Sequence, residues 1–375
     1  MLTYTVEPGE TDTHHALLAL RELEDEDPLL HVVWDDRLQE IRVQLMGAVQ
    51  LEVVEQLMRD RFRLPVTFGP GSILYQETIT APVEGVGHFE PLRHYAEVHL
   101  LLEPLPAGSG LEFASDVSLD DLDGNWQRLV LQHLREREHL GVLTGAPITD
   151  LRVTLIAGRG HLKHTEGGDF RQATYRALRQ GLMEARAGVP DVEYAAVAAR
   201  FAGDARDEAA EESAPTTTAV TARDAVGDEA PAPTSRIQGV GNCRLLEPWY
   251  RFRLELPQDM LGRAMSDVQR MSGTSEPPTM EGGYAVLEGE APVEGMRDYA
   301  MDVNAYTHGE GRLSLVFAGY RPAHDEAAVV AASGYDPEAD LEHTPDSVFC
   351  AHGAGYPVKW YRVPEFAHVP MRPLE

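Results

Sequence analysis

The sequence is poor in cysteine and in positive charge. Its 375 residues include only Cys243 and Cys350, which excludes a disulfide framework and favours a reducing compartment. Lysine and arginine number 32 against 61 aspartates and glutamates, giving a formal net charge of -29. Such a charge argues against a broad basic face for nucleic acid or anionic lipid. Any contact with nucleic acid must therefore be local.

Long apolar runs and nucleotide-binding signatures are also missing. No run is long enough to span a bilayer, and no secretory signal peptide opens the sequence. The phosphate-binding pattern G-x-x-x-x-G-K-[ST] does not occur, so the D-x-x-G match at Asp121–Gly124 is a chance one. We therefore expect a cytoplasmic protein that does not contact membranes and does not hydrolyse GTP.

Enough apolar residues are present for packed cores, because they make up 43% of the chain. The length fits two to three domains. In residues 1–80 the hydrophobic spacing predicts the order βαββαβ, the ferredoxin-like split unit. The expected strands are 2–6, 29–34, 40–45 and a final strand supplied by 66–67 and 73–78, and the expected helices are 10–26 and 50–61.

In residues 81–187 the order of expected strands and helices predicts an α+β domain whose loops gather at one end. A turn-rich loop at 103–110 joins the first two strands. The expected strands are 95–102, 111–115 and 150–156, and the expected helices are 126–139 and 169–185.

One loop of this domain, Gly158–Phe170, stands out because it combines glycines with basic groups. Gly158, Gly160, Gly167 and Gly168 would make the backbone permissive at both ends of the loop. Asp169 is expected to cap the following helix. Between the glycines lie His161, Lys163 and His164, which predict a cationic tip that contacts phosphate. The alternative is a solvated loop in which the histidines occur by chance.

Residues 188–240 form a different kind of segment. A helix is expected at 192–201, but 203–235 is dominated by alanine, threonine, proline and acidic residues. This composition predicts disorder, with an acidic interaction tail as the functional alternative.

Residues 241–321 repeat the βαββαβ order, and 322–375 extend it. The expected strands are 245–256, 278–280, 284–288 and 311–320, and the expected helices are 258–271 and 293–304. Within the extension, 344–355 contains Cys350 and His352, yet a zinc site needs two further ligands. We interpret that run as a structured turn.

Several of these segments together resemble one family. Leu17–Leu29, Gly47–Val53 and Tyr75–Thr78 are similar to the third domain of elongation factor G and of the tetracycline-resistance ribosomal protection proteins. Residues 81–187 resemble the fourth domain. Leu245–Pro248 and Gly289–Val293 resemble the fifth. The resemblance implies an α+β chain: two ferredoxin-like domains flanking an elongated domain of the ribosomal protein S5 domain 2 type.

In that family the fourth domain reaches the decoding region of the small ribosomal subunit, and the fifth packs near the stalk base of the large subunit. His161 falls where elongation factor G carries a tip histidine, but the proline of the best-known protection proteins is absent from this tip. The resemblance thus implies a monomeric, ribosome-binding chain with eight residues that contact ribosomal RNA: Gly160, His161, Leu162, Lys163, His164, Thr165, Ser109 and Gly110.

The resemblance begins after the GTPase domain of the family. The chain is therefore expected to be the carboxy-terminal part of a longer factor, or a naturally truncated form. It needs no cofactor itself, because GTP and Mg²⁺ belong to the upstream domain. Release of tetracycline is one expected role, and ordinary translocation or ribosome rescue is the alternative.

Two further alternatives stay open. His161, His164 and Glu166 have the spacing of a metalloenzyme or hydrolase site, if a third ligand lies near the two histidines. A truncated factor could also occupy the ribosome without turnover and so act as a competitor.

Overall fold

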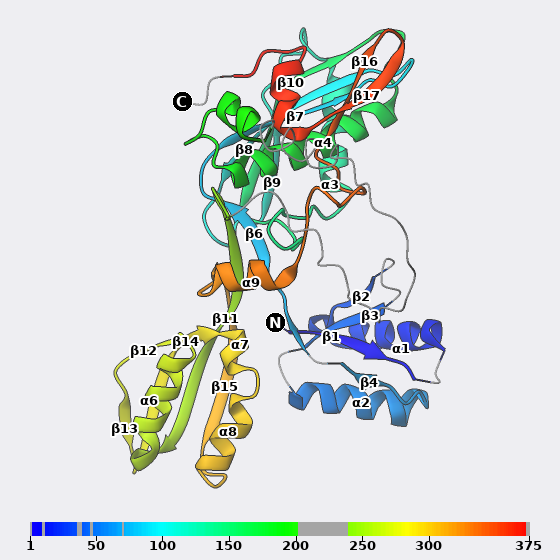
Figure 1. The fold of residues 1–375 in the computed structure, drawn as a ribbon. Helices are drawn as coiled ribbons and strands as arrows, with labels where there is room; N and C mark the ends of the chain where they lie inside the picture. The colour runs from blue at the N-terminus through cyan, green and yellow to red at the C-terminus, as the bar shows by residue number, and fades with distance from the viewer. Residues whose placement is uncertain are drawn as a thin grey trace, which may run out of the picture. The chain divides into compact units, whose positions relative to one another are not determined.

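The computed structural model describes residues 2–9, 12–35, 40–45, 48–69, 71–201 and 239–372 (Figure 1). They form two compact units, each built from two stretches of chain. The first unit contains Met1–Tyr75 and Leu246–His324, and the second contains Gln76–Leu245 and Asp325–Glu375. The end of the chain therefore returns to the domain that carries the predicted tip.

The first stretch of the first unit has an antiparallel sheet in the order β2-β3-β1-β4, with β5 also pairing with β1. Buried and half-buried residues alternate along β1 and β3, as expected for a sheet with one face covered. The predicted βαββαβ order is confirmed for the following elements: β1 Leu2–Glu7, α1 Thr13–Glu26, β2 Val32–Asp35, β3 Glu40–Leu45, α2 Ala48–Phe62, β4 Thr67–Phe68 and β5 Ser72–Ile73.

The final strand predicted from 66–67 and 73–78 is wrong as a single element, because the structure divides it into β4, β5 and a further strand. The chain leaves the sheet after β5, and Gln76–Ile79 forms a separate strand, β6, that belongs to the second unit. The boundary between the units thus lies near residue 75 rather than 80.

The second stretch of the first unit repeats the pattern around β11, in the sheet order β12-β14-β11-β15 with β13 on β14. The predicted helix 293–304 is broken in two by a turn at Arg297 and Asp298. The elements are β11 Cys243–Pro257, α6 Leu261–Arg270, β12 Thr274–Ser275, β13 Thr279–Glu281, β14 Tyr284–Pro292, α7 Val293–Met296, α8 Tyr299–Tyr306 and β15 Arg312–Pro322.

The second unit contains a six-stranded mixed sheet in the order β17-β16-β7-β8-β10-β9. Its strand β7 was not predicted, because two glycines, a glutamate and a histidine interrupt the apolar pattern. The elements are β7 Val83–Phe89, β8 Ala96–Pro104, β9 Leu111–Ser115, α3 Gly124–Arg135, β10 Leu151–Gly160, α4 Gly167–Ala187, α9 Glu326–Ser333, β16 Ser347–Ala351, β17 Ala354–Val358 and α10 Val363–Phe366.

The predicted structured turn at 344–355 is confirmed as the hairpin of β16 and β17, which joins the sheet beside β7. Residues 194–201 are helical, as expected, and Phe201 is fully buried against Trp360 and Tyr361. The predicted disorder or acidic tail at 203–235 lies outside the described residues. Among the helices that the structure describes, none is long and apolar enough to cross a membrane.

Helix α4 lies directly on the backbone of β7, and two glycines make this possible. A Cβ atom added at Gly85 would lie 2.1 Å from the carbonyl oxygen of Ala177, and one at Gly87 would lie 2.0 Å from that of Ala173. Any side chain at either position would push the helix off the sheet. The position of α4 is therefore set by the absence of side chains on β7.

Glu77 explains part of the sequence motif at 75–78. Its buried carboxylate accepts hydrogen bonds from the backbone N–H groups of Leu143 and Thr144, each at 2.8 Å, and of Ala146 at 3.3 Å. The hydroxyl of Thr144 donates a further bond at 3.0 Å. One carboxylate thus fixes the turn that leads from α3 into β10.

We predict that Glu77→Ala lowers the free energy of unfolding by about 2–4 kcal/mol, because it leaves buried N–H groups without an acceptor. Glu112→Ala, which removes an exposed ion pair with Arg152, should cost less than about 1 kcal/mol. Urea unfolding followed by circular dichroism measures both. Equal midpoints for the two variants would show that the Glu77 bonds do not hold the turn.

His139 is 6% exposed and its Nε2 lies 2.9 Å from the carbonyl oxygen of Leu134. Burial lowers the pKa of His139 to about 4. Between pH 6.5 and 4 the unfolded chain therefore binds a proton at this position that the folded chain does not bind, whereas above pH 6.5 both forms are neutral.

We predict that His139 removes roughly 3 kcal/mol of stability as the pH falls from about 6.5 to 4, with no effect above that range. His139→Gln should lose less stability over this interval than the parent chain. Unfolding free energies at several pH values test this. A parallel fall for His139→Gln and the parent would contradict the assignment.

Candidate nucleic-acid interface

The tip of the second unit consists of the residues between β10 and α4. Strand β10 continues beyond its predicted end at Ile156 to Gly160, and α4 begins at Gly167. His161–Glu166 therefore remain as a short connection. Its residues 161–164 are all exposed, and Leu162 has the largest exposed fraction, 106%, of the large apolar side chains at the surface of the described chain. The prediction that these residues project from their own domain is confirmed.

Hydrogen bonds fold the tip into a compact turn. The hydroxyl of Thr165 donates to the carbonyl oxygen of Tyr95 and accepts from the N–H of His161, both at 2.6 Å. The Nδ1 atom of His161 accepts from the N–H of Lys163 at 3.2 Å. The rings of His161 and His164 stack with centroids 4.6 Å apart. The exposed groups are thus presented on an ordered turn.

The start of α4 corrects the prediction that Asp169 is the N-cap. Glu166 is the N-cap, and Asp169 occupies the third helical position of a capping box, where it accepts from the N–H of Glu166 at 2.8 Å. The other oxygen of Asp169 lies 2.8 Å from Nδ1 of His94. The helix begins at Gly167, two residues earlier than predicted, because the N-cap of the capping box is Glu166, three residues before Asp169.

The expected role of the four glycines is also wrong. Gly158 and Gly160 lie in β10, and Gly167 and Gly168 lie in the first turn of α4. None of them has a positive φ angle, so glycine is not needed at these positions to adopt a left-handed backbone conformation. At Gly158 the constraint is space, because an added Cβ would lie 2.8 Å from a methyl group of Leu122.

The hairpin loop between β7 and β8 lies at the same end of the sheet as the tip. Ala96 pairs with both Phe89 and Gly160, so the loop at 90–95 flanks the end of β10. Two exposed side chains of this loop, Leu92 and Arg93, were missed by the sequence analysis, because only the strand register brings them to the tip. Arg159 is also exposed, but it belongs to the stretch 158–170 that the sequence analysis had already identified.

Ser109 and Gly110 do not lie with the other six predicted contact residues. The N–H of Gly110 donates to Asp150 at 2.9 Å, and its carbonyl accepts from Leu151, the first residue of β10. The tip follows the last residue of that strand, about 30 Å away. The prediction that the loops gather at one end is therefore wrong, since the 103–110 loop lies at the opposite end.

The lysines of the chain differ in their surroundings. There are two, and Lys359 forms an ion pair with Asp346 at 2.8 Å. Lys163, in contrast, has no carboxylate partner within ion-pair distance in the described parts of the chain. An exposed ammonium without an internal partner is available to an external anion.

Among the described residues, neither the tip nor the C-terminal hairpin contains a group of side chains placed to hold a metal ion. His161, His164 and Glu166 do not form a group with ligand atoms within 4.8 Å of one another, among the residues described. Cys350 pairs with Gly355 in the β16–β17 ladder, and His352 lies in the turn. Neither takes part in a potential metal-binding group of the described residues.

Two family models match parts of this chain. Residues 71–186 match the model of elongation factor G, domain IV, and residues 244–329 match that of the elongation factor G C-terminus. A crystal structure of a protein from Thermus thermophilus superposes with a TM-score of 0.60 at 21% identity, covering 88% of this chain and 42% of that one. This confirms the predicted α+β fold.

Two relatives extend the similarity to most of the chain. The tetracycline resistance protein TetP of Clostridium perfringens is 27% identical over 310 residues, covering 82% of this chain and 39% of the relative. TetM from transposon Tn916 of Enterococcus faecalis is 25% identical over 323 residues, covering 85% and 42%. The chain thus spans about two fifths of the length of these relatives.

The resemblance expected from the sequence is confirmed by these matches. Residues 71–186 belong to the elongation factor G domain IV family and residues 244–329 to the elongation factor G C-terminal family, in a chain related to the tetracycline resistance proteins.

Proposed function

We propose that this chain is the ribosome-contacting portion of a translation factor of the ribosomal protection type. Within its tip, residues His161–Thr165 contact small-subunit ribosomal RNA near the decoding region. The observation that carries this proposal is the exposure of the tip on an ordered turn. The domain IV and C-terminal matches and the tetracycline resistance relatives support the same assignment.

The chemistry of the tip suits RNA. Lys163 supplies a positive charge for a phosphate oxygen. His161 and His164 present a stacked imidazole pair whose faces are suited to unpaired bases, the usual targets in structured RNA. Leu162 adds an exposed apolar surface that can pack against a base or sugar. Arg159 and Arg93 at the same end provide further phosphate contacts.

The elements on either side of the tip hold it in a fixed position, which favours binding. It lies between a strand held in a six-stranded sheet and a helix packed on that sheet, so little conformational freedom is lost when it binds. Because the whole chain carries a net charge of -29, attraction to RNA depends on these local groups and on shape.

In this role the chain does not itself hydrolyse GTP. The matched models are a domain IV and a C-terminal domain, and GTP with Mg²⁺ would belong to a GTPase domain outside this sequence. Release of tetracycline is the role that the names of the relatives favour. Elongation factor-like translocation or rescue is the alternative, because the family models match elongation factor G.

We predict that the double variant His161→Ala, Lys163→Ala weakens ribosome binding roughly tenfold, through loss of one stacking and one phosphate contact. The slope of log affinity against log salt concentration should fall by about 1. Co-sedimentation with 70S ribosomes at several salt concentrations measures both quantities.

A matched control is Arg152→Ala, which also removes a positive charge but lies at the opposite end of β10 from the tip. This control should bind ribosomes as the parent does. Equal affinity and equal salt slope for the tip variant and the parent would remove the tip from the mechanism.

A further inference from the structure

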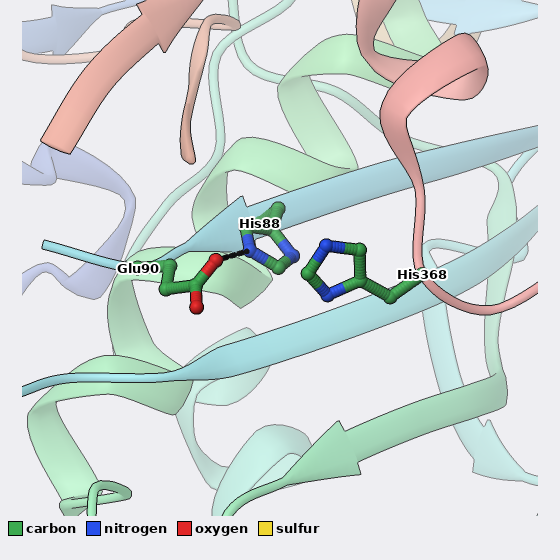
Figure 2. A group of neighbouring side chains, drawn as sticks. All are labelled: His88, Glu90 and His368. Carbon is green, nitrogen blue, oxygen red and sulfur yellow. Dashed lines mark hydrogen bonds and ion pairs between the residues drawn. The ribbon is translucent and has the colours of Figure 1, made fainter. Parts of the chain in front are cut away.

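Three side chains from distant parts of the sequence converge beside the tip. His88 lies in β7, Glu90 directly follows that strand, and His368 belongs to the C-terminal segment after α10. One nitrogen of each imidazole and one carboxylate oxygen of Glu90 lie within 4.8 Å of one another (Figure 2). The distance between Nε2 of His88 and Oε2 of Glu90 is 3.2 Å.

Both imidazoles are oriented by a second partner. Nδ1 of His88 lies 2.6 Å from Oε2 of Glu97, and both side chains are completely buried. Nδ1 of His368 lies 3.0 Å from the hydroxyl of Tyr95. Each ring is thus held through Nδ1, which leaves its Nε2 available. Metal-binding histidines characteristically have such an outer carboxylate or other hydrogen-bonding partner on the second nitrogen.

We propose that His88, Glu90 and His368 bind one zinc ion, which fastens the C-terminal segment to the sheet directly behind the tip. Two imidazoles and one carboxylate form a ligand set that zinc accepts, whereas Mg²⁺ and Ca²⁺ prefer oxygen ligands alone. His368 is exposed and Glu90 is half-buried, so the fourth position is open to water.

The required movement is small and falls on the side chains that can move. Ligands of a tetrahedral zinc ion lie roughly 3.4 Å from each other, at metal distances of about 2.0–2.2 Å. The pair His88 and Glu90 already meets this spacing. His368 can close the remaining gap by side-chain rotation, while His88 is fixed by Glu97 and by stacking on Phe349 with centroids 4.0 Å apart.

The segment that the ion would fasten already follows the sheet. The N–H groups of His368 and Val369 donate to Glu97 at 3.0 and 2.6 Å, and that of Arg372 donates to Glu84 at 2.7 Å. Tyr95 connects this segment to the tip, because its carbonyl oxygen accepts from Thr165 while its hydroxyl meets His368. Zinc binding would therefore stabilise the C-terminal segment and, through Tyr95, its connection to the tip.

This inference does not depend on the proposed ribosome contact, so it is tested on the purified chain. Metal-stripped protein is titrated with Zn²⁺ against a chromophoric chelator, and with Co²⁺ to record the visible bands of a four-coordinate ion. We expect one equivalent to bind. His368→Ala and Glu90→Gln should each weaken binding at least tenfold, and both replace residues that are not fully buried, so folding should persist.

The competing site is the stacked histidine pair of the tip. His161→Ala should leave zinc binding unchanged, as should His352→Ala in the exposed hairpin turn. Loss of binding in His161→Ala, unchanged affinity in His368→Ala, or absence of a stoichiometric site in the parent chain would each overturn the proposal. Tyr95→Phe should weaken binding by about 10-fold or more if the outer partner orients His368.

A second measurement tests the fastening role. Zinc should slow amide hydrogen exchange at His368, Val369 and Arg372 in the parent chain and have no such effect in His368→Ala. If zinc binds at one equivalent but exchange at these three amides is unchanged, the ion does not hold the C-terminal segment and that part of the proposal fails.

Discussion

The contact between α4 and the bare backbone of β7 determines where the tip lies. Gly85 and Gly87 remove the side chains that would separate them, and the facing residues of α4, including Ala173 and Ala177, are small. The helix is thereby held in close contact with the sheet. Because the tip joins β10 to α4, a helix that moved away from β7 would carry the tip with it. Close packing between α4 and β7 thus fixes the position of the tip at the surface of the domain.

Hydrogen bonds then hold the tip itself. Thr165 connects it to the neighbouring β7–β8 hairpin through Tyr95, and the capping box of Glu166 and Asp169 fixes the first turn of α4. The exposed residues 161–164 contribute little to this framework. They can therefore be substituted with little effect on the fold, which separates the binding chemistry from the stability of the domain.

The periodicity of apolar residues in the sequence predicts most helices and strands, but it does not predict how these elements assemble. The alternating apolar residues of β1, β3 and β11 predicted both ferredoxin-like units. Strand β7 was missed because the glycines that admit α4 are poor strand formers. The return of the C-terminal hairpin to β7 depends on pairing between residues such as Phe89 and Val348, which no local pattern records.

The candidate site was predicted only in part. The basic loop after β10 was identified from composition, and its exposure is confirmed. The placement of Ser109 and Gly110 failed because strand direction, which the sequence does not state, takes that loop to the far end of β10. Arg93 and the group of His88, Glu90 and His368 were invisible for the same reason, since only the register of the folded sheet and the path of the C-terminal segment bring them together.

The central claim is that the tip touches the ribosome, and the two lysines of the chain allow a direct test. The chain is treated with an amine-acetylating reagent, with and without ribosomes, and the modification of each lysine is followed by mass spectrometry. The account predicts that ribosomes protect Lys163 while Lys359, in its ion pair with Asp346, serves as the internal reference. Equal modification of Lys163 in the bound and free chain would contradict it.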